Sequence, residues 1–254
     1  IVIHLAARVH VMRDRVADPL AEFRRVNTDG TLRLAEQAVA AGVKRFIFLS
    51  TTKVTGELSP PSGFSETDPA RPEDGYGVSK WEAEQALLEI SKTTSMEVVI
   101  LRPPLVYGPG VKGNFLTLLK AVDRGTVLPL GAIQNQRSLI YVGNLADVIV
   151  TATTHADAAN QTFFVSDEGT VSTTSLIENI AASLNKKPRL INLPPGLLKF
   201  AGALTGKSGA IQRLIGSLTV DSGKIRSLLN WRPPFTMTEG LKLTADWWRS
   251  VKNK

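Results

Sequence analysis

Short apolar runs alternate along the chain with longer segments whose apolar residues recur at helical spacing. The apolar runs are predicted strands at residues 1–6, 45–50, 97–102 and 138–142. Segments 18–41 and 76–93 are predicted amphipathic helices, and Gly42 is expected to end the first of them. Strands that are apolar on both faces and joined by helical crossovers predict a parallel sheet covered by helices on both sides.

The pattern changes after residue 103, where Pro and Gly become frequent and short strands such as "TFFVS" separate the helices. The later helices are predicted at residues 114–124, 174–184 and 237–251. The expected fold is α/β, a Rossmann-like parallel sheet flanked by helices with a smaller mixed α/β substrate lobe. The sheet domain is expected to comprise residues 1–105 and 137–165, and the lobe residues 106–136 and 166–254.

Composition excludes several kinds of chemistry. The 254 residues are 43% hydrophobic and contain no Cys, so disulfides, thiolate metal sites and a cysteine nucleophile are ruled out. Absence of Cys is typical of a reducing compartment and predicts a cytoplasmic location. Because no apolar run reaches the roughly 18 residues that span a bilayer, stable membrane insertion is not expected.

The formal charge of +7 favours an anionic partner without saying which. Lys and Arg look scattered and few aromatic residues accompany them, so nucleic acid is not an expected partner. His4 has no companion histidine or carboxylate cluster, so it is interpreted as a structural residue and no metal site is predicted.

The stretch "YGVSK" places Tyr76 four positions ahead of Lys80. On a helix this spacing puts a phenol and an ammonium on one side, as a proton-transfer pair or merely as two residues on one helix face. Ligands of open parallel sheets bind at the carboxyl ends of the strands. Ser50, Thr51 and Pro103 follow predicted strands at that edge, which favours the proton-transfer pair.

An ordered series of motifs resembles the extended short-chain dehydrogenase/reductase family, in particular its NAD-dependent epimerases and dehydratases. The motifs are "HLAA" (4–7), "VNTDGT" (26–31), "FIFLSTTKVTGE" (46–57), "YGVSK" (76–80), "LRPPLVYGPG" (101–110), "RSLIYVGNLAD" (137–147) and "LNWRPP" (229–234). They cover nearly the whole chain. The closer likeness is to bacterial UDP-N-acetylquinovosamine dehydrogenases, which are 4-keto reductases, and to UDP-glucose 4-epimerase-like proteins.

The resemblance implies a catalytic triad of Thr51, Tyr76 and Lys80. Hydride transfer at a sugar carbon requires a group that takes or gives the hydroxyl proton, which is the expected role of Tyr76. Its free pKa of about 10 is too high for a base, so Lys80 and the cofactor are expected to lower it. Lys80 is also expected to hold ribose hydroxyls. Thr51 lies 25 positions before Tyr76 and should orient the substrate oxygen; alternatively its hydroxyl only caps a turn.

The implied cofactor is NAD or NADP. The residues expected to contact it, besides Tyr76 and Lys80, are Leu5, Ala6, Ala7, Asn27, Ser50 and Pro103. The small residues after the first strand should let the backbone pass beneath the cofactor, although ordinary strand packing is compatible with them. The amide of Asn27 is expected to tie a helix to a neighbouring loop.

The implied substrate is a UDP-sugar. Arg137 matches the arginine that grips the diphosphate, a bidentate task suited to guanidinium, unless it is a solvated surface residue. Asn114 and Phe115 match the stretch that meets the uridine, and Lys53 could reach a substrate oxygen. The tandem Trp247 and Trp248 are expected to pack a C-terminal amphipathic helix.

The chain also departs from the family. Leu105 replaces a common asparagine and Thr55 a common tyrosine. Thr52-Lys53 stands where dehydratases usually carry Asp-Glu, which disfavours dehydration. The family's Gly-rich pyrophosphate turn and roughly sixty residues before Ile1 have no counterpart. A true fragment is expected to expose an apolar strand edge, to dimerise or aggregate through it, and to bind dinucleotide poorly.

The sequence therefore predicts an NAD(P)-dependent nucleotide-sugar oxidoreductase acting at C4 of a UDP-hexose in surface-polysaccharide sugar synthesis. Both 4-keto reduction and 4-epimerisation fit, since they need the same triad. The alternative is a non-catalytic dinucleotide sensor or an inactive fragment of this fold. The resemblance also implies a homodimer whose interface uses helices 18–41 and 76–93.

Overall fold

The computed structural model describes residues 1–9, 18–206 and 208–252. Its main sheet is parallel, with the strand order β1-β2-β3-β6. The strands are β1 (Val2–His4), β2 (Arg45–Leu49), β3 (Glu97–Arg102) and β6 (Thr162–Phe164). The first three predicted strands are thus confirmed, with ends that differ by up to two residues, and so is the parallel sheet.

The predicted strand at 138–142 does not join this sheet. It forms β5 (Leu139–Tyr141), which pairs in parallel with β4 (Leu105–Tyr107) in a separate two-stranded sheet. The place beside β3 is taken by β6, with Leu101 opposite Phe163. Apolarity alone could not separate the two strands, because both are buried and both follow β3 in the chain.

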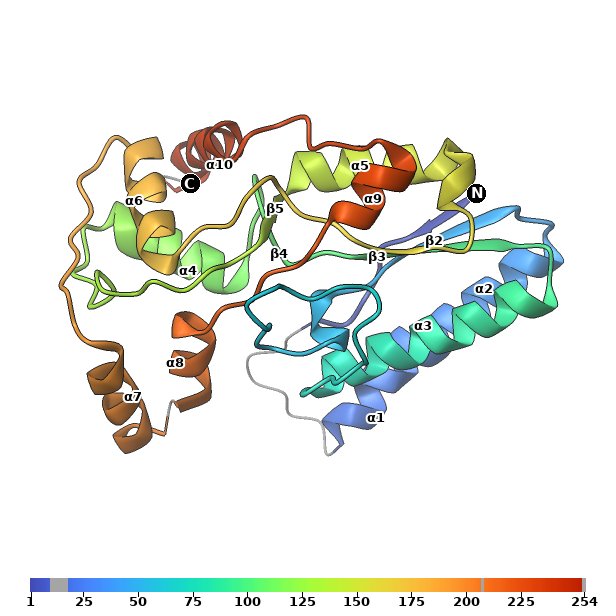
Figure 1. The fold of residues 1–254 in the computed structure, drawn as a ribbon, viewed down its shortest axis with the longest axis horizontal. Helices are drawn as coiled ribbons and strands as arrows, with labels where there is room; N and C mark the ends of the chain where they lie inside the picture. Colours follow the sequence, from blue (N-terminus) through green and yellow to red (C-terminus); the bar gives the residue numbers. More distant parts are fainter. Residues whose placement is uncertain (10–17, 207, 253–254) are drawn as a thin grey trace.

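One face of the sheet is covered by two long helical segments (Figure 1). The first runs through α1 (Pro19–Phe23), the π-helix η1 (Arg24–Asp29) and α2 (Gly30–Ala40); the second is α3 (Gly75–Thr93). Phe46 and Phe48 of β2 point to this face and pack with Ala83 and Leu87 of α3. Gly42 has φ of +72°, the left-handed conformation expected where the first segment stops.

The other face is covered by α5 (Val142–Thr154) and α9 (Gly223–Leu229) (Figure 1). Ile47 points to this side, as the alternation along a strand requires. Ile225 and Leu229 of α9 and the nearby Trp231 join the same core cluster. These three lie in the range that the sequence interpretation gave to the lobe, and they pack on the sheet.

The remaining helices gather at the other end of the molecule (Figure 1). They are α4 (Gly113–Asp123), α6 (Thr173–Ser183), α7 (Pro195–Leu204), α8 (Ser208–Ile215) and α10 (Met237–Val251). A second core joins α4, α6 and α10, with Trp247 and Trp248 packed against it. The indole of Trp248 also donates to Asp123 at 3.0 Å, so the tandem tryptophans anchor α10 as expected. Two 3-10 turns, η2 (Thr52–Val54) and η3 (Ala156–Ala158), complete the described elements.

Candidate active site

Helix α3 carries the Tyr76–Lys80 pair at its start. Asp74 is the N-cap, and its carboxylate accepts from the backbone N–H of Gly77 at 2.7 Å. A Cβ on Gly77 would lie 2.9 Å from the carbonyl oxygen of Lys53, so glycine lets the helix start approach the loop after β2. This close approach brings Tyr76 to the carboxyl end of the sheet.

Thr51 meets Tyr76 there. Thr51 follows β2, has extended backbone (φ −160°, ψ 153°), and caps η2 by accepting from the N–H of Lys53. Its hydroxyl also lies close enough to the phenol of Tyr76 to lower the pKa of that phenol. Two of the three predicted triad residues are therefore neighbours, and the capping role that was the alternative for Thr51 is fulfilled at the same time.

Lys80 lies one turn further along α3 and is only 1% exposed. Its ammonium nitrogen sits 3.7 Å from the centroid of the Phe48 ring and contributes to lowering the pKa of His4. His4 itself stacks on Phe48 and hydrogen-bonds Thr31 at 2.9 Å, as a structural histidine does. Burial lowers the pKa of Lys80 to about 7, against the charge of Glu84, which raises it.

In the protein alone, Lys80 does not lower the pKa of Tyr76 as expected. Burial is the largest influence and raises the pKa of Tyr76 to about 12; the negative charge of Asp74 acts in the same direction. Only the nearby Thr51 hydroxyl opposes them. Since Lys80 is partly neutral at pH 7, it offers less positive charge than the sequence argument assumed.

Behind the pair lies a buried charged network that the sequence analysis missed. Glu84, fully buried, is bound by Arg102 through two hydrogen bonds of 3.1 and 2.5 Å. The hydroxyl of Ser50 donates to the same carboxylate. Ser50 precedes Thr51, and Glu84 is one turn beyond Lys80. The network therefore holds the end of β2 and helix α3 together. Glu84 follows Tyr76 and Lys80 at the same spacing of four residues, so the sequence could have placed it on the same side of the helix.

Asn27 is buried at the π-helical turn of the first segment. Its amide donates to the carbonyl of Arg8 and to the hydroxyl of Ser79, each at 3.0 Å, and its oxygen accepts from the N–H of Arg8 at 2.7 Å. Ser79 in turn donates to the carbonyl of Tyr76. Asn27 thus ties the chain after β1 to the catalytic helix. A π-turn widens the backbone locally and is common at functional sites.

The other predicted cofactor contacts also lie at strand ends. Leu5 and Ala6 are exposed and Ala7 is half-buried just after β1, while Pro103 is buried after β3. The carbonyl of Pro103 accepts from the N–H of Thr52 at 3.0 Å, which joins two strand ends. Small side chains on an exposed backbone beside a buried, partly neutral ammonium fit the nicotinamide half of a dinucleotide. Their contacts with a cofactor stay a prediction.

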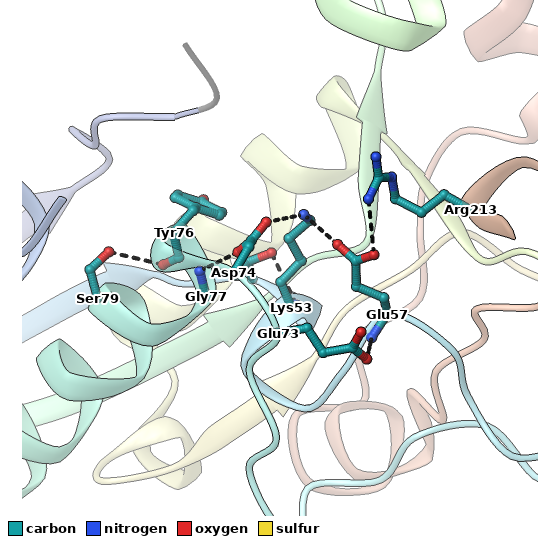
Figure 2. Close-up of polar contacts among 9 residues, drawn as sticks. Lys53, Glu57, Glu73, Asp74, Tyr76, Gly77, Ser79 and Arg213 are labelled. Carbon is teal, nitrogen blue, oxygen red and sulfur yellow. Dashed lines mark hydrogen bonds and ion pairs between the residues drawn. The ribbon is translucent and has the colours of Figure 1, made fainter. Parts of the chain in front are cut away.

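Lys53 belongs to a chain of charges rather than pointing alone at a ligand (Figure 2). Its ammonium pairs with Asp74 at 2.5 Å and with Glu57 at 3.0 Å, and Glu57 also binds Arg213 of α8 at 3.3 Å. This row of ion pairs links the N-cap of α3 to the lobe. Asp74, Glu57 and Arg213 were missed because the sequence gives no sign that α8 lies beside this loop.

The predicted substrate residues differ in their surroundings. Arg137 is half-buried and donates to the carbonyls of Arg213 and Gly216 at 2.6 and 3.2 Å. Asn114 is exposed at the start of α4, whereas the Phe115 side chain is 2% exposed and stacks on Tyr107 in the lobe core. The side chain of Phe115 therefore packs the core, and any contact of this residue with a ligand falls to its backbone.

Two cavities accompany the site. One of about 320 Å³ is lined by Glu57, Glu73, Asp74 and Arg213 among others, next to the charge chain. A larger one of about 660 Å³ is lined by α7, α8 and residues 133–135, and it shares Leu58 and Gln212 with the first. Within residues 1–9, 18–206 and 208–252, no cluster of side chains could hold a metal ion. Across the same residues, no helix is long and apolar enough to cross a membrane.

The parallel sheet and the Tyr76–Thr51–Lys80 arrangement at its carboxyl edge define the class as a Rossmann-like enzyme. The sequence profile of the NAD dependent epimerase/dehydratase family matches residues 1–165. A protein named UDP-glucose 4-epimerase from Vibrio cholerae is 48% identical over 258 residues, which cover 100% of this chain and 78% of the relative. The chain therefore belongs to the NAD-dependent epimerase/dehydratase family.

Other relatives agree. The N-acetyl-alpha-D-glucosaminyl-diphospho-ditrans,octacis-undecaprenol 4-epimerase of Escherichia coli O157:H7 is 29% identical, covering 92% of this chain and 74% of its own. The solved UDP-glucose 4-epimerase of Thermotoga maritima, with UDP-glucose, superposes with a TM-score of 0.75 at 24% identity, covering 98% and 77% of the two chains.

These comparisons confirm the predicted family, the Rossmann-like fold, the enzyme class and a nicotinamide dinucleotide as cofactor. They favour the enzyme over the non-catalytic sensor.

Proposed function

We propose that the protein acts at C4 of a UDP-hexose with NAD or NADP, by 4-epimerisation through a 4-keto intermediate or by 4-keto reduction, in the synthesis of surface-polysaccharide sugars. The single observation that carries this proposal is the closeness of the Thr51 hydroxyl to the phenol of Tyr76, with Lys80 buried one turn away. The names of the Vibrio cholerae and Escherichia coli relatives support a C4 reaction.

The protonated phenol suits reduction. With a pKa of about 12, Tyr76 holds its proton throughout the neutral range. Bound nicotinamide supplies or accepts the hydride at C4. Tyr76 donates its proton to the sugar oxygen as that oxygen gains negative charge, and Thr51 holds the same oxygen by its hydroxyl. An alkoxide is a stronger base than a phenolate, so a high pKa does not prevent this donation.

In the oxidative half of epimerisation, Tyr76 must accept the hydroxyl proton instead of donating one. This requires positive charge nearby to stabilise the phenolate. Lys80 is the chain's own source, and its pKa near 7 makes its charge responsive to what binds beside it. Arg137 and Asn114 would meet the UDP moiety, and Lys53 would hold a sugar oxygen.

The experiment uses purified protein with each of several UDP-sugars and each nicotinamide cofactor. Net consumption of reduced cofactor, followed by its absorbance, indicates 4-keto reduction; conversion of one sugar epimer to the other without net consumption indicates epimerisation. A Tyr76→Phe variant should lose either activity. No turnover of any UDP-sugar by a protein that binds cofactor would refute the proposal.

We also propose a cytoplasmic homodimer that uses the faces of α1–α2 and α3. The support is that both segments lie on one side of the sheet with much of their outer surface exposed (Figure 1). Light scattering on the purified protein tests the oligomeric state. A monomer at micromolar concentration would rule the dimer out.

A further inference from the structure

One segment lacks acidic residues and is therefore net positive, although its Lys and Arg are hardly denser than elsewhere in the chain. Residues 179–220 contain six of the 30 Lys and Arg and none of the 23 Asp and Glu. The segment therefore carries six of the seven net positive charges, and the rest of the chain is nearly neutral. Among its described residues, Lys186 pairs with Asp123 and Arg213 with Glu57, and Lys187, Arg189 and Lys199 are exposed. Exposed basic residues of this kind favour an extended anionic partner over a small metabolite.

Helix α7, inside this segment, is apolar almost all around. Lys199 is its one charged residue, and the others are Pro, Gly, Ala, Leu and Phe. A helix of this composition is normally buried. Here only Leu198 and Gly202 are buried.

The exposed residues of α7 form a stripe opposite the buried edge. Leu197, Phe200 and Leu204 are 53, 64 and 74% exposed. At the helical repeat they lie on one side, and Leu198 and Gly202 lie roughly on the reverse side. Gly202 allows close contact with α8, since a Cβ there would lie 2.7 Å from the side chain of Ile211.

The stripe lies at the edge of the molecule. Helix α7 packs on α8 and projects beyond it, and the loop from α6 to α7 runs along the same edge (Figure 1). Lys187 and Arg189 in this loop are exposed, and Ile191 after them is 54% exposed. These basic residues precede the apolar residues of α7 on the loop that leads into the helix.

We propose that the α7 ridge, defined as Leu197, Phe200 and Leu204 with the exposed Lys187 and Arg189 of the preceding loop, docks the enzyme on an anionic lipid surface. The apolar side chains enter the boundary between headgroups and acyl chains, and the basic side chains meet the lipid phosphates. With ten residues and a length of about 15 Å, α7 is too short to cross a bilayer. The docking is therefore peripheral and reversible.

Charge distinguishes lipid from the other occupants of such a face. A two-fold interface with a second copy would bring the exposed Lys187, Arg189 and Lys199 toward the same residues of that copy. Nucleic acid would satisfy Lys187 and Arg189 but leave three large apolar side chains facing phosphates. Anionic lipid can accommodate both the apolar side chains and the basic side chains of this surface.

The test is co-sedimentation of the full chain with vesicles of phosphatidylcholine alone or with about a third phosphatidylglycerol. We expect at least tenfold more binding to the anionic vesicles, reduced by high salt. Leu197→Ser/Phe200→Ser/Leu204→Ser should fall to the level of neutral vesicles, and Lys187→Gln/Arg189→Gln should bind several-fold less. Val150→Ser/Leu243→Ser, which removes two exposed apolar side chains elsewhere, should bind as the wild type.

Each other result overturns the proposal. Equal binding to both vesicle types, no binding, or retained binding by the triple variant excludes lipid docking at the ridge. A dimer that the triple variant converts to a monomer assigns the face to a second copy, and tighter binding to duplex DNA than to anionic vesicles assigns it to nucleic acid. Circular dichroism and turnover of a UDP-sugar in solution, unchanged in all variants, show that folding and the active site are intact.

Discussion

Replacing Lys80 by Met should stabilise the protein while abolishing its activity. Met keeps an unbranched side chain over Phe48 but carries no charge to desolvate. Burial lowers the pKa of Lys80 from 10.5 to about 7. The unfolded chain therefore binds more protons than the folded chain between these pH values, and wild-type stability rises with pH across that window.

The size of the effect follows from the same shift. Each pKa unit corresponds to about 1.4 kcal/mol, so Lys80 costs the fold roughly 4 kcal/mol at pH 7 and roughly 2 kcal/mol at pH 9. Allowing for relaxation around the charge, we expect Lys80→Met to raise the free energy of unfolding by about 2–4 kcal/mol at pH 7. That gain should shrink by about 2 kcal/mol at pH 9.

Urea unfolding at the two pH values measures this difference. Lys92→Met is the matched control, because Lys92 is on the same helix, is exposed, and pairs only with exposed Glu89 among the described residues. It should change stability by less than about 0.5 kcal/mol at either pH. A Lys80→Met protein that is less stable than wild type, or whose gain is the same at both pH values, refutes the reasoning about desolvation.

Three further substitutions test the site. Tyr76→Phe should lower kcat by about 100-fold or more with little change in substrate affinity, measured by steady-state kinetics. Glu84→Gln leaves Arg102 without its charged partner and should cost about 3–5 kcal/mol in urea unfolding, while Glu89→Gln on the exposed face of α3 should cost less than about 0.5 kcal/mol. Asp74→Asn keeps an N-cap acceptor but removes a charge that raises the pKa of Tyr76, so the acidic limb of sugar oxidation should move to lower pH; an unmoved kcat profile contradicts this.

Local patterns were enough to predict helix α3 and the placement of Tyr76 and Lys80 on it. The apolar spacing of 76–93 gave α3 to within one residue, and Tyr76 and Lys80 share its inner side as their spacing requires. Thr51 was found because it follows a buried strand, and parallel strands end at one edge. These features depend on residues close in sequence or on a general rule of sheet topology.

Features set by distant residues escaped prediction. Arg102 reaches Glu84 and Arg213 reaches Glu57 only because the folded chain brings separate elements together. The π-turn around Asn27 likewise depends on partners at Arg8 and Ser79, while its own sequence reads as ordinary helix. In the chain alone the pKa of Tyr76 is raised, whereas the predicted lowering relied on Lys80 together with the cofactor; a sequence shows a neighbouring ammonium but not its burial.

Burial acts on Tyr76 and Lys80 in opposite directions with a common result. It raises one pKa and lowers the other, so it favours the neutral phenol and the neutral amine together. An anionic ligand beside Lys80 would favour the ammonium, and an ammonium in turn favours the phenolate. The charge of the pair should therefore follow what binds, which keeps the tyrosine a proton donor until a ligand is in place and lets it act as an acceptor only afterwards.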